Sequence, residues 1–407
     1  MKKVFIIEQF IFPEGWSGAE YPKEISIYLA KKGYEITIIC SKKPNILENI
    51  NYHDDPRLHN VKIIHIDVPY RAKNTIKKLC NQIYFCFAAF SKMLFIKDID
   101  LFLTFSNPPQ IILLNQLILF LRKIPYIINA MDLYPDALIN HIDNKVISNL
   151  TGIFLDIFYD VAYRNANHVI CRGENMLSKV RSKGVDEQKL SIINNWSTGD
   201  IKESNSLVYK KKWDLIAKQI IIYTGNLGLA HDYLSILKAI KISNLKAKDI
   251  QIVFMAKGKR ITEAKNFVKK YKLEKIVIFK DLVSNKEFSK VLSISDLALV
   301  TIKEGFSGVV YPSKFQGYIS RSVPIMYIGP QSEISNILRR NNLGVSFNNN
   351  DIEGLKNFII DLTKEKLDTY EWGRNAKSFY LENMAKEKIL DKYFKVVTAN
   401  LVKPILE

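Results

Sequence analysis

The sequence predicts an α/β protein with two doubly wound, Rossmann-like parallel sheets that face each other across a cleft. Three observations favour this fold. The chain has 407 residues, which is more than one hydrophobic core usually serves. Short apolar segments alternate with helical segments in two successive series, as βαβ units require. A polar, basic stretch at 198–218 separates the two series and has the composition of a linker.

The first series begins with a short apolar strand at 4–8. A helix at 23–32 follows and ends at Gly33, a residue type that often terminates helices. A basic helix is expected at 71–97 and a long helix near 148–165. Further strands are expected at 35–40, 61–66, 101–105, 126–129, 168–171 and 190–194.

The second series repeats the alternation after the linker. Its strands are expected at 219–224, 250–256, 275–279, 297–300, 323–328 and 344–347. The chain closes with two helices, near 352–364 and 383–402. We therefore expect an N-terminal domain at 1–197, a linker at 198–218 and a C-terminal domain at 219–382, with residues 383–407 packing back onto the first domain.

Composition and spacing exclude several classes of protein. The apolar run at the start is too short for a signal peptide. The four cysteines lack CxxC spacing and the histidines lack zinc-site spacing, so we expect reduced thiols and assign no metal. GxGxxG is absent after the first strand and GxxxxGK[ST] is absent throughout. These absences argue against a nicotinamide or flavin oxidoreductase and against P-loop phosphoryl transfer.

A net charge of +18 indicates an anionic partner. The charge concentrates at 71–97, where six basic side chains and no acidic one accompany apolar residues at helical spacing. This segment is either a core helix of the first domain or a helix that lies on an anionic bilayer. No stretch reaches about 18 uninterrupted apolar residues, so none is expected to span a membrane. Nucleic acid is not expected as a partner, because no recognition module accompanies the charge.

Two turns of the second series have the residues that a phosphate site needs. In the turn at 223–228 a strand ends in Gly225 and Gly228, and glycines let backbone N–H groups approach a ligand closely. In the turn at 310–314 Ser313 can begin a helix whose positive end and Lys314 would face one phosphate. Each turn alone also fits an ordinary glycine turn or a capped helix.

Several segments, in order, resemble family 4 glycosyltransferases with the GT-B fold. The resemblance is greatest to the bacterial enzymes that build colanic acid, O-antigen or capsule repeat units. The segments are spread over about 300 residues, so that their order is more specific than any one of them. They are Ser17–Glu20, Ala30–Thr37 (AKKGYEIT), Asp132–Asp136 (DLYPD), Ile192–Trp196 (IINNW), Tyr223–Gly228 (YTGNLG) and Val310–Pro324 (VYPSK…VP).

The resemblance implies transfer of a sugar from a nucleoside diphosphate sugar, of UDP or GDP type, to a hydroxyl acceptor. It further implies retention at the anomeric carbon, a hexosyl or N-acetylhexosaminyl group, and no metal or other cofactor. We expect the acceptor to be a saccharide linked to polyprenyl diphosphate. The enzyme is then expected to be cytoplasmic and peripheral on the inner face of the plasma membrane, with the basic helix 71–97 at the membrane surface.

The expected site residues fall into three groups. Lys314, Glu304 and Asp132 are expected to be catalytic. Donor binding is expected from Gly225, Asn226, Gly228, Ser313, Lys314 and Glu304. Acceptor binding is expected from Gly18, Glu20, Asp132 and His141, although Asp132 also fits a helix cap or a turn with Pro135, and His141 a surface position.

The chain departs from the family pattern at several positions. Asn226 and His231 stand where most members have an arginine and a lysine, so Lys314 is expected to carry much of the interaction with the diphosphate. Gly317 stands in the place of a second glutamate, and Ser320-Arg321-Ser322 replaces an Ala-x-Gly motif. These departures leave two alternatives open. One is a nucleotide-sugar 2-epimerase of the same architecture, and the other is a catalytically silent binding subunit.

Overall fold

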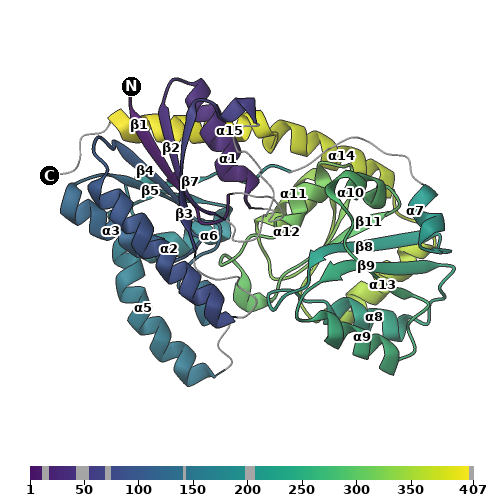
Figure 1. The fold of residues 1–407 in the computed structure, drawn as a ribbon. Helices are drawn as coiled ribbons and strands as arrows, with labels where there is room; N and C mark the ends of the chain where they lie inside the picture. Colours follow the sequence, from purple (N-terminus) through teal and green to yellow (C-terminus); the bar gives the residue numbers. More distant parts are fainter. Residues whose placement is uncertain (12–17, 43–54, 69–74, 141–143, 198–206, 403–407) are drawn as a thin grey trace. The chain divides into compact units, whose positions relative to one another are not determined.

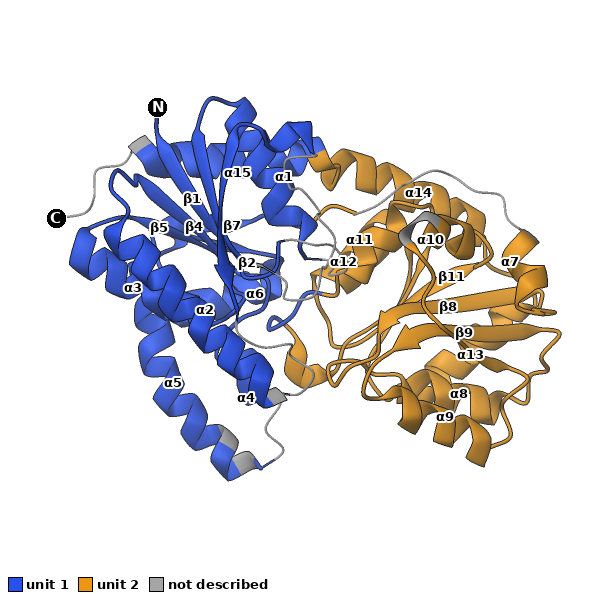
Figure 2. Ribbon diagram, in the orientation of Figure 1, with its two compact units in different colours: residues 1–194, 308–311, 387–407 blue, residues 195–307, 312–386 orange. Residues whose placement is uncertain are grey.

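A computed structural model describes residues 1–11, 18–42, 55–68, 75–140, 144–197 and 207–402 (Figure 1). The chain divides into two compact units (Figure 2). Unit 1 comprises Met1–Asn194, Gly308–Tyr311 and Glu387–Glu407, and unit 2 comprises Asn195–Ser307 and Pro312–Lys386. Each unit contains one parallel sheet with helices on both faces. The predicted fold class is therefore confirmed.

The sheet of unit 1 has seven strands in the order β3-β2-β1-β4-β5-β6-β7. All neighbouring strands pair in parallel, and the central strands are apolar and buried on both faces, as the middle of such a sheet requires. The strands are β1 Lys3–Ile7, β2 Glu35–Lys42, β3 Val61–Asp67, β4 Leu101–Phe105, β5 Tyr126–Asn129, β6 His168–Cys171 and β7 Leu190–Ile192. The order reverses between β1 and β4, which makes their carboxyl ends the switch point of this sheet.

The helices of unit 1 cover both faces of its sheet (Figure 1). One face carries α2, α3 and α5, which contribute Phe85, Ile112 and Tyr159 to the core. The other face carries α1 and α15, where Tyr34, just after α1, donates or accepts a 2.8 Å hydrogen bond with Thr398. The bounds are α1 Glu20–Lys31, α2 Thr75–Phe95, α3 Ile111–Arg122, α4 Asp136–Ile139, α5 Lys145–Asn165, α6 Glu174–Ser182 and α15 Lys386–Val402.

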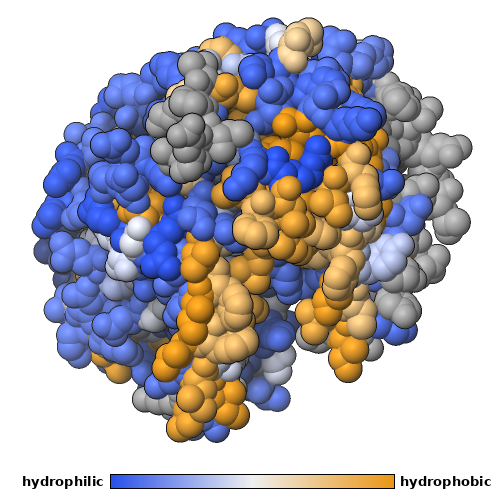
Figure 3. Space-filling view, turned by 90° about the vertical axis from the view of Figure 1, so that its left-hand side faces the viewer, coloured by the Kyte–Doolittle hydropathy of each residue, from blue (hydrophilic) through white to orange (hydrophobic). Residues whose placement is uncertain are grey.

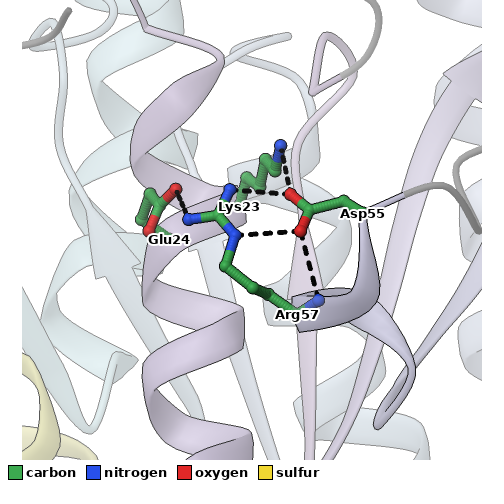
Figure 4. Close-up of polar contacts among 4 residues, drawn as sticks. All are labelled: Lys23, Glu24, Asp55 and Arg57. Carbon is green, nitrogen blue, oxygen red and sulfur yellow. Dashed lines mark hydrogen bonds and ion pairs between the residues drawn. The ribbon is translucent and has the colours of Figure 1, made fainter. Parts of the chain in front are cut away.

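A cluster of charged residues joins α1 to the short 3₁₀ helix η2 (Pro56–Leu58) that precedes β3 (Figure 4). Arg57 donates to both carboxylate oxygens of Asp55, at 2.9 and 2.7 Å, and to Glu24 at 3.0 Å. Lys23 forms a second ion pair with Asp55 at 2.9 Å. Hydrogen bonds from Arg57 hold the pKa of Asp55 well below its usual range. The cluster fixes α1 to the strand that it covers.

The sheet of unit 2 has six parallel strands in the order β10-β9-β8-β11-β12-β13. Its switch point lies between β8 and β11. The strands are β8 Gln219–Asn226, β9 Ile250–Lys257, β10 Val277–Lys280, β11 Leu297–Thr301, β12 Ile325–Ile328 and β13 Gly344–Phe347. The helices are α7 Leu207–Lys212, α8 Leu234–Ser243, α9 Ile261–Lys270, α10 Asn285–Leu292, α11 Lys314–Ile319, α12 Glu333–Asn341, α13 Ile352–Thr363 and α14 Thr369–Asn383.

Two helices of the structure were not expected from the sequence. The expected linker contains a helix, α7, which is held in place because Tyr209 is buried, stacks edge-on against Trp213 and donates a hydrogen bond to Glu287. The end of the chain contains a further helix, α14, which the sequence pattern does not predict. Gly373 weakens the helical pattern there, but a Cβ at this position would lie 2.4 Å from the carbonyl oxygen of Ser322, so close packing explains the glycine.

Candidate active site

The donor residues expected in unit 2 meet at the carboxyl end of β8. Gly225 has a φ of +96°, a left-handed conformation that glycine adopts without strain. A Cβ on Gly225 would lie 3.4 Å from Cε of Lys314, so the lysine side chain passes directly over this turn. Tyr318, one turn further along α11, shares hydrogen bonds of 2.9 Å with the backbone N–H and the hydroxyl of Thr224. This contact fixes the start of α11 against the end of β8.

Lys314 faces a second hydrogen-bond donor rather than a carboxylate. Its Nζ lies 3.1 Å from Nε2 of His231 and 5.0 Å from the centroid of the Tyr223 ring. The Nδ1 atom of His231 accepts a hydrogen bond from the Gly228 N–H at 3.1 Å. The neutral imidazole therefore carries its proton on Nε2, directed at the lysine.

This environment disfavours positive charge on both groups. Burial lowers the pKa of Lys314 to about 8. Burial, followed by the charge of Lys314, lowers the pKa of His231 to about 3. Among the residues that the structure describes, no carboxylate forms an ion pair with Lys314. An anion beside this pair would accept from both the ammonium and the Nε2–H group and would raise the pKa of Lys314 again.

The backbone contributes less to this site than the glycine turns suggest. The Gly228 N–H already donates to His231, and the Leu227 N–H donates to the carbonyl of Lys257 at 2.7 Å. Ser313 stands at the N-cap of α11, but its side chain makes no capping hydrogen bond, and the helix has only six residues. Asn226 is exposed at the end of β8. Lys314 and His231 are therefore the side chains of this turn that are best placed to donate hydrogen bonds to an anion.

Glu304 lies at the other side of the switch point, in the 3₁₀ helix η4 (Glu304–Phe306) that follows β11. Its side chain is exposed. The Lys303 N–H donates to the carbonyl of Ala230 at 2.8 Å, which attaches this loop to the residues beside His231. Asn349 strengthens the connection by donating to Asp232 at 2.7 Å and to the Ile302 carbonyl at 3.0 Å. Glu304 is thus held at the same edge of the sheet as Lys314.

Two of the acceptor residues expected in unit 1, Asp132 and Gly18, lie near the end of β5. Asp132 pairs with Val310 in an isolated antiparallel bridge, and its N–H lies 3.3 Å from the Ser106 hydroxyl. It does not cap α4, whose N-cap is Pro135. Burial, opposed by the charge of Arg172, raises the pKa of Asp132 to about 6. Gly18 lies beside Met131, because a Cβ there would be 4.0 Å from the methionine Cε.

The two remaining acceptor candidates are less well defined. Glu20 is the first residue of α1 and is partly exposed. His141 lies outside the residues that the structure describes.

Two charged residues that the sequence patterns did not indicate, Glu8 and Arg172, follow strands of the unit 1 sheet, and Arg172 lies near Asp132. Glu8 follows β1 at the switch point and accepts from the Asn107 side chain, which follows β4, at 2.8 Å. Burial raises the pKa of Glu8 to about 8. Arg172 follows β6, is 1% exposed and donates to Asn129, to the Ile193 carbonyl and to Tyr393 of α15. Each of the two is a charged residue directly after an apolar strand, and this pattern in the sequence could have indicated both as site residues.

Known proteins share this architecture. Residues 18–196 match the model of Glycosyltransferase Family 4. The chain is 23% identical over 314 residues to the probable glycosyltransferase WbjE of Pseudomonas aeruginosa. The aligned residues are 75% of this chain and 75% of that protein.

Solved structures with the same fold cover almost the whole chain. A sucrose-phosphate synthase from Thermosynechococcus elongatus has a TM-score of 0.71 and 13% identity, covering 98% of this chain and 99% of its own. HepE of Anabaena in complex with UDP-glucose has a TM-score of 0.70 and 10% identity, covering 98% of this chain and 100% of its own. WaaG, a glycosyltransferase involved in lipopolysaccharide biosynthesis, has a TM-score of 0.64 and 12% identity, covering 97% of this chain and 99% of its own.

The two parallel sheets and the solved structures define the GT-B fold. The match to the family model and the similarity to the curated relative support a glycosyltransferase. The resemblance to family 4 glycosyltransferases is confirmed, with the family match lying over residues 18–196.

Proposed function

We propose that the protein transfers a hexosyl or N-acetylhexosaminyl group from a nucleoside diphosphate sugar to a hydroxyl of a lipid-linked saccharide, in the synthesis of a surface polysaccharide. In this proposal unit 2 binds the nucleotide sugar and unit 1 binds the acceptor, so that the two units serve as the donor and acceptor domains. The observation that carries the proposal is the half-buried Lys314, which has a donor neighbour in His231 and no carboxylate partner among the described residues.

The donor diphosphate fits the Lys314–His231 pair chemically. Negative charge grows on the diphosphate as the bond to the sugar breaks, and a fixed cation next to it lowers the barrier. Lys314 supplies this charge, and the Nε2–H of His231 supplies a neutral hydrogen bond. Glu304, exposed at the same sheet edge, would accept hydrogen bonds from hydroxyls of the donor. Because HepE has been solved with UDP-glucose, we favour a UDP sugar over a GDP sugar.

The acceptor hydroxyl fits the carboxyl group of Asp132 in unit 1. A pKa near 6 leaves this carboxyl ionised at neutral pH and able to accept a hydrogen bond from the attacking hydroxyl. Gly18 and Glu20 would line the acceptor side near Asp132. We propose retention at the anomeric carbon and no metal, as the family resemblance implies. The α2 helix, which carries Lys77, Lys78 and Lys92 of the expected segment 71–97, would lie at an anionic membrane surface on the cytoplasmic side. Residues 71–74 of that segment lie outside the described residues.

Replacement of Lys314 tests the donor site. Lys314→Gln removes the charge and is expected to weaken UDP binding and to lower kcat/KM by about 10²–10³-fold. The exposed Lys269→Ala on α9 is the matched control, because it removes one positive charge far along the chain from the site. UDP affinity would be measured by calorimetry and turnover by UDP release. Unchanged affinity and turnover in Lys314→Gln would contradict the proposal.

Two further measurements separate the alternatives. Incubation with donor alone yields an epimer only if the protein is a 2-epimerase. A silent binding subunit would bind UDP but release none from any UDP sugar and acceptor. The anomeric configuration of the product, read by NMR, tests retention.

A further inference from the structure

Helix α5 of unit 1 is apolar on two opposite faces. Its inner face packs Tyr159, Ala162 and Tyr163 into the core. Its outer face exposes large apolar side chains at i, i+1, i+4, i+7, i+8, i+11 and i+12, a spacing that forms one stripe along a helix. These side chains are Val146, Ile147, Leu150, Ile153, Phe154, Ile157 and Phe158, each at least half exposed.

The apolar stripe of α5 continues onto its neighbours. Helix α3 contacts both α5 and α2, so the three helices form one surface. α3 adds exposed Leu117, Phe120 and Leu121, and α2 adds exposed Ile76, Ile83, Phe87 and Phe95, among others. Figure 3, which faces this side of unit 1, shows the apolar side chains gathered in one broad area. An exposed apolar patch of this extent marks an interaction surface.

The charges around this surface favour an anionic lipid bilayer as its partner. Helices α2 and α3 contain no acidic residue, whereas exposed Lys77, Lys78 and Lys92 lie on α2, and exposed Lys97 and Lys123 lie just beyond the ends of α2 and α3. The acidic residues of α5, Asp156 and Asp160, are both paired with Lys183 and are turned away from the apolar stripe. An apolar surface with a basic margin matches acyl chains below anionic headgroups.

The helix length fits a position in the plane of the bilayer. No helix among the described residues is long and apolar enough to cross a membrane. α5 has 21 residues, which at about 1.5 Å per residue gives a helix of roughly 30 Å. Its exposed stripe covers three turns or more, so the whole face would contact lipid at once when the helix lies flat.

We propose that α5 is a membrane-inserting helix, whose outer face enters the acyl region while the lysines of α2 contact anionic headgroups. The inference rests on the membrane part of the proposed function and extends it from charge attraction by α2 to apolar insertion by α5. It is independent of the glycosyl-transfer chemistry, because none of the residues involved lies in the candidate active site.

The test compares vesicle flotation of two triple variants. Ile153→Gln, Phe154→Gln and Ile157→Gln together make the stripe polar, and are expected to lower partitioning onto phosphatidylcholine–phosphatidylglycerol vesicles by at least about tenfold. The same positions changed to leucine should keep wild-type partitioning. Val208→Gln with Ile216→Gln is the matched control, because both residues are about two-thirds exposed in unit 2. UDP binding is measured for each variant as well. Unchanged UDP binding shows that a variant is folded and that its donor site is intact, independently of its flotation.

Several outcomes would overturn the inference. Wild-type flotation of the glutamine variant would show that the stripe does not insert, and if flotation is lost only on Lys77→Gln with Lys78→Gln, the charge-based proposal survives alone. A third outcome is that the wild type does not bind vesicles but forms dimers in light scattering, and that the glutamine variant is monomeric. This would assign the stripe to a second copy of the chain.

A spectroscopic measurement gives a second readout that does not depend on a polar triple variant. A polarity-sensitive dye on Leu150→Cys, with the exposed Cys80 changed to serine, should shift to the blue on vesicles. Emission unchanged by vesicles would contradict insertion.

Discussion

Burial makes the charged form of Lys314 less favourable than it is in water, and a bound anion would offset this cost. Burial lowers its pKa to about 8, and a bound diphosphate would raise that value again. UDP affinity should therefore be constant below pH 8 and should fall about tenfold for each pH unit above it, because binding then requires the uptake of a proton. Calorimetric titrations between pH 6.5 and 9.5 would measure this. Lys314→Arg should give a flat profile, since arginine stays protonated, and an alkaline loss that persists in this variant would contradict the assignment.

Glu8 is expected to make the folded protein less stable as the pH rises. Burial raises its pKa from 4.5 to about 8, so the folded state holds a proton that the unfolded state releases between these values. At about 1.4 kcal/mol per unit of pKa difference, the loss of stability reaches a few kcal/mol by pH 8. Glu8→Gln keeps an oxygen that can accept from Asn107 and cannot ionise.

The Glu8→Gln variant should match the wild type at pH 4.5 and exceed it in unfolding free energy at pH 8.5. Urea unfolding at both values would measure the difference. A constant gap between the two proteins at all pH values would show that Glu8 is not titrating in this range.

Residue types at the site could be predicted from the sequence, but their partners could not. Lys314 and Gly225 follow from turn composition, because a glycine and a lysine at strand ends are readable signals. The contact of Lys314 with His231 joins residues 83 positions apart and depends on the course of two loops. Arg172 was missed for a similar reason, because its role depends on Tyr393, 221 residues later in the chain.

At the scale of elements, the turn between α11 and β12 holds a serine in a conformation that suits glycine. Ser322 has a φ of +60° and occupies the place of the family's glycine. A side chain in this region is strained, so Ser322→Gly should raise the unfolding free energy by about 0.5–1 kcal/mol. Chemical denaturation would measure it. Ser320→Gly is the control, because Ser320 has a φ of −62° and a glycine there should destabilise the protein.

Strands were easier to predict than helices in this chain. Buried parallel strands such as β1, β4 and β11 are short runs of apolar residues, and each was expected to within a residue or two. Helices α7 and α14 were not predicted. Half of the residues of α7 are lysines, and Gly373 interrupts the helical pattern of α14. The two-faced apolar character of α5 is visible in the sequence, but which face is covered depends on packing.

For the whole molecule, two separate cores imply that the units respond differently to perturbation. Tyr393→Phe removes the hydroxyl that accepts from Arg172 and donates to Asn129, which should cost unit 1 about 1–3 kcal/mol. UDP should still stabilise unit 2, by about 2.7 kcal/mol at a hundredfold excess over its Kd. Calorimetric scans with and without UDP would resolve both effects. A UDP response lost in Tyr393→Phe would show that the hydroxyl also supports the donor site.

Unit 1 is built from segments near both ends of the chain, and this determines the order in which its parts are synthesised. Helix α15 supplies Tyr393 to the buried guanidinium of Arg172, yet it is translated after both sheets. The ribosome therefore makes all of unit 2 while the first sheet still lacks this partner. The nascent N-terminal half must wait, with its arginine incompletely bonded, until the helix emerges from the exit tunnel and completes it.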